Sequence, residues 1–249
     1  MKPAREKFAI YTCITGDYDE LVAPACIEDG ADYFCFTDRP VSQASGWMLR
    51  PLPVRHGDPV LDNRYVKMHP HLLFPEHDGS LYLDGNIRIK APVLDFAGQA
   101  LSRGELALFT HPFRNCLYDE AKEVAMLGYD WYWRVLSQTR HYEAQGFPHH
   151  FEMFEANLMF RSHHQPRLVH VMEAWWREFQ SGVRRDQISL SFVLWQCGME
   201  AVNLGVSDLR FAQTMFYSDF QHKHVMAKGL AARGKFNRLM RRIKLWPRQ

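Results

Sequence analysis

Short hydrophobic segments alternate with longer amphipathic ones along this 249-residue chain, and that alternation limits the possible folds more than any other feature of the sequence. Runs rich in aromatic and β-branched residues, which are typical of strands, occur at 8–14, 33–37, 80–83, 106–110 and 156–160. Helical spacing of apolar residues marks segments 63–74, 92–101, 118–145, 168–179 and the stretch that begins at Asp186. A break is expected near Pro70 in the first of these. Strands interleaved with helices predict an α/β fold with a mixed, mostly parallel sheet, flanked by helices on both faces.

Composition places the chain among ordinary globular proteins. Hydrophobic residues make up 47% and charged residues 23%, which excludes the disordered, collagen-like and coiled-coil classes. No apolar run approaches the ~20 residues that a membrane-spanning helix needs, and segment 8–14 is interpreted as a first strand rather than part of a signal peptide. The five cysteines are scattered without C-x-x-C spacing, so we expect a reducing cytoplasm and neither a disulfide framework nor a zinc ribbon.

The net charge of +2 conceals a basic C-terminal tail. Eight Lys and Arg residues lie from Lys228 onward and no acidic residue follows Asp219, which leaves a charge of −6 for residues 1–227. We therefore expect a single domain over 1–227 and a basic amphipathic tail over 228–249. Such a tail suits either the anionic inner face of a membrane or a solvated helix laid against the domain. Nucleic acid is not an expected partner, because the basic charge is confined to the tail and no binding motif accompanies it.

The segment Ser80–Ile89, SLYLDGNIRI, carries the clearest sign of chemistry. A hydrophobic strand stops at Asp84 and is expected to resume at 87–89. Open α/β sheets bind ligands beyond the carboxyl ends of their strands. Side chains two residues apart on extended backbone point the same way, so Asp84 and Asn86 can converge on one object. Their oxygens suit Mg²⁺ or Mn²⁺, with diphosphate and water completing the shell. The alternative is an Asx-Gly turn in a hairpin.

Further short motifs occur in a characteristic order along the chain. They are Tyr11–Asp19 and Phe34–Arg39 at the ends of the first two strands, Arg64-x-x-Lys67, Lys67-x-x-Pro-His71, Phe74-Pro-Glu76, Tyr82-Leu-Asp-Gly-Asn-Ile87, His111-Pro112, Glu155-x-Asn157, Arg161, Trp175-Trp176 and Arg185-Asp-Gln187. The ordered set, over roughly residues 8–205, resembles a glycosyltransferase-like family of plant turgor-regulation and seed-mucilage proteins and their bacterial relatives, formerly a domain of unknown function. The resemblance implies a GT-A-like (Rossmann-like) nucleotide-sugar transferase fold.

The resemblance also implies roles for individual residues in binding the donor. The end of the first strand in GT-A enzymes holds the base and ribose, and the matching residues are Thr12, Thr15 and Tyr18. The acidic residue that contacts the nucleoside from the second strand matches Asp38, and the basic residues that meet the phosphates match Arg64 and Lys67. His111 is expected to line the sugar pocket. The metal motif matches Asp84 and Asn86, and a late histidine that completes the metal shell matches His222. Asn86 departs from the usual D-x-D motif, so one negative charge fewer faces a Mn²⁺ or Mg²⁺ ion.

Sugar transfer also needs groups that stabilise charge and accept a proton. The bond to the anomeric carbon breaks through a cationic sugar, which a nearby carboxylate or amide stabilises. Asp186 and Gln187 are the candidates, and Asp186 is also a candidate base for the acceptor hydroxyl. Glu155 is the rival base. Alternatively, Asp186 is a helix N-cap and Glu155 is an exposed residue at a strand edge.

The remaining histidines and tryptophans give weaker signals. None of the thirteen histidines lies in an H-E-x-x-H or Cys-rich context, so a zinc site is not expected. The aromatic cluster from Trp131 to Trp133 suits either stacking on a sugar or, as the favoured interpretation, the buried core.

The sequence thus predicts a glycosyltransferase. Its donor is expected to be a nucleoside-diphosphate sugar, its acceptor a glycan or a glycolipid, and its setting surface polysaccharide synthesis in the cytoplasm at the inner face of the membrane. A sugar nucleotidyltransferase is one alternative, although the acidic segment 15–19 lacks the Gly-rich basic loop that triphosphate binding needs. A non-catalytic protein that binds nucleotide or glycan is the other.

Overall fold

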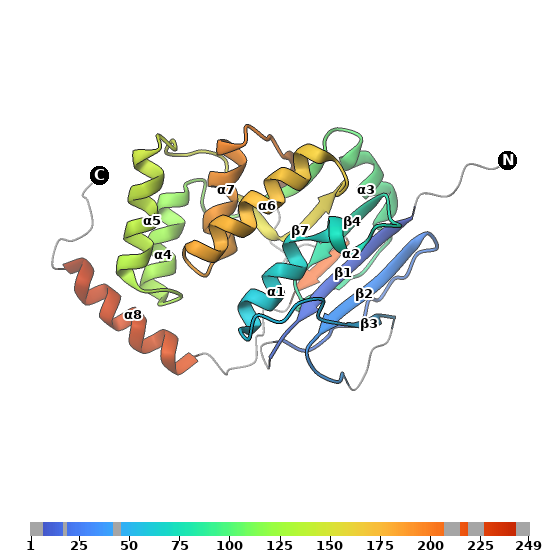
Figure 1. Ribbon diagram of the computed structural model, residues 1–249, viewed down its shortest axis with the longest axis horizontal. Helices are drawn as coiled ribbons and strands as arrows, with labels where there is room; N and C mark the ends of the chain where they lie inside the picture. The colour runs from blue at the N-terminus through green and yellow to red at the C-terminus, as the bar shows by residue number, and fades with distance from the viewer. Residues whose placement is uncertain (1–6, 17–18, 42–45, 207–214, 219–226, 243–249) are drawn as a thin grey trace.

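The central feature of the fold is one mixed sheet. The computed structural model describes residues 7–16, 19–41, 46–206, 215–218 and 227–242. Within them, seven strands pair in the order β3-β2-β1-β4-β7-β6-β8 (Figure 1). Their bounds are β1 Phe8–Ile14, β2 Ala31–Thr37, β3 Met48–Pro51, β4 Gly79–Leu83, β6 Leu106–Thr110, β7 Phe154–Arg161 and β8 Val202–Val206. Only β7 runs antiparallel to its neighbours, so the predicted mixed, mostly parallel sheet is confirmed.

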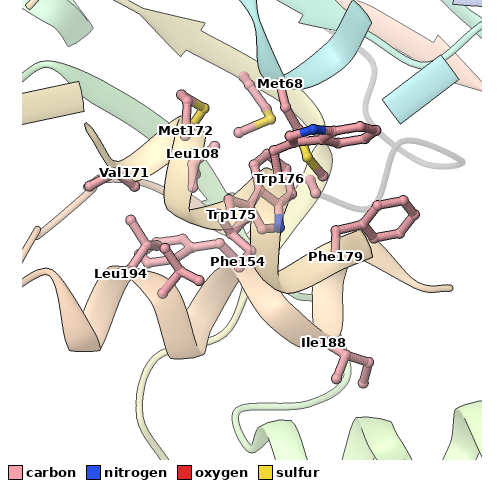
Figure 2. Packing of buried hydrophobic residues seen from close by; sticks show 14 of the residues in the cluster. Met68, Leu108, Phe154, Val171, Met172, Trp175, Trp176, Phe179, Ile188 and Leu194 are labelled. Atoms are coloured by element: carbon pink, nitrogen blue, oxygen red, sulfur yellow. The ribbon is translucent and has the colours of Figure 1, made fainter. Parts of the chain in front are cut away.

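Helices cover both faces of this sheet, as predicted. The helices are α1 Pro59–Met68, α2 Pro70–Leu73, α3 Leu94–Leu101, α4 Leu117–Leu127, α5 Tyr132–Ala144, α6 Pro166–Ser181, α7 Asp186–Gln196 and α8 Ala227–Arg242. Alternate residues of β1 separate the two cores: Tyr11 packs in the core under α1, α6 and α7, whereas Ile10 packs with α3. In the larger core, Trp175 and Trp176 of α6 are buried among apolar side chains from the sheet and from α7 (Figure 2).

Two stretches differ from their sequence interpretation. Segment 87–89 does not extend the preceding strand but forms β5, Ile87–Ile89, which pairs with β9, Phe216–Ser218, in a separate two-stranded sheet. The expected helix over 118–145 is two helices, because Gly128 takes the left-handed conformation (φ 83°) and ends α4. The break expected near Pro70 is confirmed, since α1 ends at Met68 and α2 begins at Pro70.

The described part of the basic tail is α8, which packs against α4 (Figure 1). Backbones approach closely here: a Cβ on Gly128 would lie 2.2 Å from the Leu230 carbonyl oxygen. Asn237, fully buried, donates to the carbonyls of Ala125 (2.8 Å) and Asp130 (2.9 Å) and accepts from the Tyr132 N–H (3.0 Å). Among the described residues, no helix combines the length and apolar character that crossing a bilayer requires.

Asn237→Ala tests whether this contact fixes α8. The substitution removes three buried hydrogen bonds. The Asp130 carbonyl and the Tyr132 N–H lose their Asn237 partner, whereas the Ala125 carbonyl keeps the Gly128 N–H (3.1 Å), so we expect the free energy of unfolding to fall by about 2–3 kcal/mol. Urea unfolding measures the change. Lys235→Ala, at an exposed position of the same helix, is the matched control and should change stability by no more than about 0.5 kcal/mol. Equal stability of the Asn237 and Lys235 variants would contradict a docked α8.

Candidate functional site

The candidate site lies where β1, β2 and β4 end at the same edge of the sheet. Asp84 directly follows β4; its N–H donates to the Asn157 carbonyl (3.0 Å), and its own carbonyl accepts from the Ile87 N–H (3.0 Å). The residues between β4 and β5 do form a turn, but these strands belong to different sheets, so the hairpin interpretation is wrong. Gly85 is required by close packing, because a Cβ there would lie 2.6 Å from Ile14 Cγ2.

A cluster of buried charges surrounds Asp84. Lys67 Nζ lies 2.5 Å from Asp186 Oδ2 and 3.7 Å from Asp84 Oδ1. Arg64 Nε lies 3.0 Å from the same Asp186 oxygen, without the geometry of a hydrogen bond. The side chains of Lys67 and Asp186 are only 2% and 6% exposed. Burial alone would raise the pKa of Asp186, but the charges of Arg64 and Lys67 and the hydrogen bond from Lys67 outweigh it and hold that pKa well below its ordinary value.

Hydrogen bonds from the core hold this cluster in place. The Tyr82 hydroxyl donates to Asp84 Oδ1 (3.0 Å), and the Trp175 indole N–H donates to the Asp186 carbonyl (3.0 Å). The Lys67 carbonyl, at the end of α1, accepts from the Tyr11 hydroxyl (3.1 Å) and from Arg161 (2.7 Å). A low-dielectric surrounding strengthens such bonds, so the charges are fixed by residues that never reach solvent.

A second titratable cluster lies beside the first, on β7 and α4. The backbone N–H groups of Phe113 and Arg114 donate to His111 Nδ1 (3.1 and 3.0 Å). Its Nε2 therefore carries the proton and lies 3.5 Å from Glu155 Oε1 and 3.8 Å from Glu120 Oε2. Arg114 Nε pairs with that same Glu120 oxygen.

The pKa values of this second cluster are shifted in opposite directions. Burial, reinforced by the charge of Glu120, raises the pKa of Glu155 to about 7. Burial and the charges of Arg114 and Arg185 lower the pKa of His111 to about 4. The charges of Asp84 and Lys67 also act on Glu155, so the two clusters form one electrostatic unit.

An irregularity in β7 aims Glu155 at this site. Residues 155–158 of β7 face a single residue of β6, Phe109, because the register shifts between the Leu108–Met159 and Thr110–Phe154 pairs. Such bulges bend a strand and redirect its side chains. Glu155 is consequently half-buried beside His111, with a side chain 18% exposed, rather than exposed at a strand edge.

The other predicted residues lie at several different places. The Thr15 hydroxyl donates to the Pro59 carbonyl (2.7 Å), and Asp38 Oδ2 accepts from the Gly16 N–H (3.0 Å). Thr12 lies within β1, not at its end, and its buried hydroxyl has no hydrogen-bond partner among the residues that the structure describes. The Gln187 amide donates to the Phe154 carbonyl (3.3 Å). Tyr18, His222 and residues 243–249 of the tail lie outside the described residues.

The metal-ligand prediction rests on Asp84 and the half-buried Asn86. Over the residues that the structure describes, no group of three or more His, Cys, Asp or Glu side chains is arranged to hold a metal ion. Asp84 and Asn86 alone therefore offer two oxygen ligands, and most of the coordination shell of Mg²⁺ or Mn²⁺ must come from substrate and water.

Two interpretations from the sequence are wrong. Asp186 is not the N-cap of α7 but its first helical residue, and Arg185 occupies the N-cap position without a capping hydrogen bond from its side chain. The favoured core assignment fails for Trp131 and Trp133, which are 40% and 50% exposed; only Tyr132 between them is buried. Trp131 is the N-cap residue of α5 and Trp133 lies in its first turn.

Sequence reasoning missed three members of the site: Arg185, Glu120 and Arg114. The Arg185 guanidinium lies over the Tyr129 ring at 4.5 Å, and its charge lowers the pKa of Glu155, Glu120 and Asp186. Its place in the Arg185-Asp-Gln187 motif was the available signal. Glu120 gave none, because an acidic residue in the first turn of a helix is ordinary.

The strand order with a single antiparallel strand, and a charged cluster at the carboxyl edge, define an α/β protein with a GT-A-like, Rossmann-type fold. The family TOD1/MUCI70, glycosyltransferase-like domain, matches residues 54–228, more than half of the chain. The protein belongs to this family, as the resemblance predicted. A comparison with curated proteins gave no match.

Asp186→Asn tests the buried ion pair. Removing one partner of such a pair costs about 3–5 kcal/mol, so we expect the free energy of unfolding at pH 7 to fall by about 3 kcal/mol or more. The folded-state pKa of Asp186 is lowered, so its stabilisation is complete above the ordinary value of 3.8 and is lost as the pH falls through the folded-state pKa. The difference in unfolding free energy between wild type and variant should therefore be constant from pH 7 to 5 and should narrow only below pH 3.8. Urea unfolding from pH 7 to below pH 3.8 measures this difference.

The control is Asp119→Asn, which removes a part-exposed pair with Lys122 (3.0 Å) on the surface of α4 and should cost no more than about 1 kcal/mol. A cost for Asp186→Asn as small as that of the control would show that the pair contributes nothing.

Proposed function

We propose that this protein transfers a sugar from a nucleoside-diphosphate sugar to a glycan or glycolipid acceptor, in the synthesis of surface polysaccharide. The observation that carries the proposal is the fixed charge cluster of Asp84, Arg64, Lys67 and Asp186 at the carboxyl edge of the sheet. Ligands of open α/β sheets bind at this edge, and membership of a glycosyltransferase-like family supports a sugar substrate.

The cations have different parts in stabilising the diphosphate leaving group. Negative charge grows on the diphosphate as its bond to the anomeric carbon breaks, and preorganised cations stabilise it. Arg64, with a side chain 19% exposed, is the cation proposed to meet the phosphates. Lys67, whose side chain is 2% exposed, is proposed to act indirectly, by holding the carboxylates of Asp84 and Asp186 in position.

Asp38 and Thr15 are proposed to hold the nucleoside. Asp38 Oδ2 accepts from Gly16, but its Oδ1 is buried without a hydrogen-bond partner among the described residues. A buried acceptor without a donor is costly, and a ribose hydroxyl or a base N–H would supply one. His111 is proposed to line the sugar pocket beside Glu155.

A divalent ion, Mn²⁺ or Mg²⁺, is proposed to be held by Asp84 and Asn86. The side chain of Asp84 is 35% exposed, and its Oδ1 is engaged by Tyr82 and lies near Lys67. These oxygens suit a hard cation that keeps most of its ligands from diphosphate and water. When bound, the ion would supply further positive charge to the leaving group.

Glu155 is the better candidate for the base that accepts the proton of the acceptor hydroxyl. A base works best with a pKa near the operating pH, and the pKa of Glu155 is raised to about 7. Asp186, with a strongly lowered pKa and two cations on one oxygen, is a weak base. We propose that Asp186 positions the two cations. Gln187 donates to the Phe154 carbonyl, and we propose that it positions the strand that carries Glu155.

The setting we propose is the cytoplasmic side of an anionic membrane. The described tail residues of α8 are basic and lie on the domain surface, and phospholipid headgroups of that face are anionic. A glycolipid acceptor would be presented there.

Asp84→Ala should abolish sugar transfer and leave the fold intact, because the residue is part-exposed and lies in a turn. Release of nucleoside diphosphate from a panel of nucleotide sugars, with Mn²⁺ and with a chelator, measures turnover. Thermal shift with the same panel measures binding, since a ligand that binds only the folded state raises the melting temperature.

The control is Asp95→Ala at an exposed position of α3, which should keep full activity. Transfer by the Asp84 variant at the wild-type rate would refute the assignment. Donor binding by the wild type with no turnover on any acceptor would favour the non-catalytic alternative.

Glu155→Gln should lower kcat about 10²–10⁴-fold, the usual contribution of a positioned base. In the wild type, kcat/KM should rise tenfold per pH unit below about 7 and level off above it, because only the carboxylate form of Glu155 accepts a proton. Its pKa is raised, so the active form is lost on acidification. The variant should lack this limb. Glu152→Gln, at an exposed position of the same segment, should keep both rate and profile, and an unchanged limb in Glu155→Gln would assign the titration to another group.

A further inference from the structure

Four exposed apolar side chains gather where α8 meets the start of α5. Trp131, Trp133, Phe236 and Leu239 are 40%, 50%, 39% and 55% exposed. The two indoles stack at 4.8 Å with their planes 13° apart, and the Phe236 ring stands edge-on to both, at 5.8 and 6.1 Å. A contiguous exposed apolar patch on a protein surface marks an interaction site.

This patch is preformed. The buried Asn237 ties α8 to the end of α4 and to the Tyr132 N–H between the two tryptophans. Gly234 allows the close approach, because a Cβ there would lie 2.8 Å from the Met126 carbonyl oxygen. The face of α8 with Gly234 and Asn237 is therefore occupied by α4. The surface left for a partner combines residues of α8 with residues at the start of α5.

Basic side chains border the patch. The Arg233 guanidinium lies over the Trp131 ring at 5.4 Å and donates to the Tyr129 carbonyl (3.0 Å). Lys235 and Arg238 are exposed on the same helix, and Arg238 reaches the α4 side of it, where it donates to the Met126 carbonyl (2.9 Å). Residues 227–242 contain six Lys and Arg and no Asp or Glu. Amphipathic aromatic rings beside cations match the headgroup layer of an anionic bilayer, where rings occupy the interface and each cation gains from the surface potential.

We propose that this surface, made of Trp131, Trp133, Phe236 and Leu239 with Arg233, Lys235 and Arg238, docks the protein on an anionic phospholipid bilayer. The docking is separate from sugar transfer and needs no substrate. It also differs from the insertion of a free amphipathic tail, because one face of α8 is already packed on the domain.

Two other occupants fit less well. A glycan stacks on a free ring face, but Trp131 already has Trp133 stacked on it and Arg233 over it. A second copy in a two-fold interface would set one basic helix against another, and such like-charge contacts are unfavourable.

Co-sedimentation with vesicles tests the proposal. The full chain should bind vesicles of phosphatidylcholine mixed with phosphatidylglycerol, should not bind phosphatidylcholine alone, and should lose binding as salt is raised. Trp133→Ala should weaken the partition coefficient at least about tenfold, since it removes a half-exposed aromatic ring. Lys235→Gln should weaken it about fivefold, as expected for one cation near the surface.

Leu72→Ala and Arg103→Gln are the matched controls, at an exposed apolar position on α2 and an exposed basic position before β6; both should bind as the wild type does. Leu239→Ser gives a second apolar variant if Trp133→Ala does not fold. Equal binding by wild type and the Trp133 and Lys235 variants overturns the proposal. The proposal is also overturned if the wild type is a dimer and Trp133→Ala dissociates it, because the patch then binds a second copy. It is overturned as well if Trp133→Ala abolishes the binding of a glycan while vesicle binding persists. Since vesicle binding is measured without donor, loss of sugar transfer leaves this result unaffected.

Discussion

The contact between Lys67 and Asp186 holds the site together. The two residues are 119 positions apart in the chain. Their 2.5 Å contact joins the end of α1 to the start of α7, two helices that cover the same face of the sheet. Neither charge could remain buried alone, because desolvating an unpaired ion costs several kcal/mol. Arg64 adds one further cation and Asp84 one further anion, so the formal charges of the four-residue cluster sum to zero. The edge of the sheet is therefore shaped by charge neutralisation as much as by apolar packing, and the hydrogen bonds from Tyr11, Arg161 and Trp175 to the backbone at Lys67 and Asp186 serve that arrangement.

The environment separates the carboxylates of the site by their pKa values. Asp186 faces two cations and stays ionised, whereas Glu155 is buried near the like charge of Glu120 and has a pKa raised to about 7. When the environment shifts the pKa values of two carboxyl groups in opposite directions, one group commonly serves in acid–base chemistry and the other in electrostatic stabilisation. His111 reinforces the division, because its lowered pKa keeps it neutral and its Nε2 proton faces Glu155.

Strands and their edges could be predicted from the sequence because their signal is local. The alternation of apolar runs gave β1 at its observed bounds and placed Asp84 at the end of β4. The partner of each charge could not be predicted, since the Lys67–Asp186 contact depends on how α1 and α7 cross the same face. The bulge at 155–158 was equally hidden, because it depends on the register between β6 and β7. The exposure of Trp131 and Trp133 could not be predicted either, because it depends on which side of α5 faces the core, whereas the aromatic character of the cluster favoured the core.

One buried residue connects the aromatic surface to the site. The Asp130 carboxylate accepts from the Trp131 N–H (2.7 Å) and from the Arg184 N–H (3.0 Å), while its carbonyl accepts from Asn237. Arg184 precedes Arg185 and Asp186, so the segment that carries two site residues is anchored to the same aspartate that orients Trp131. Because buried, fully bonded groups leave little freedom, the surface of Trp131 and α8 and the charge cluster have a fixed mutual orientation. If the surface docks on a bilayer as proposed, that docking would also set the direction from which the charge cluster meets the proposed acceptor.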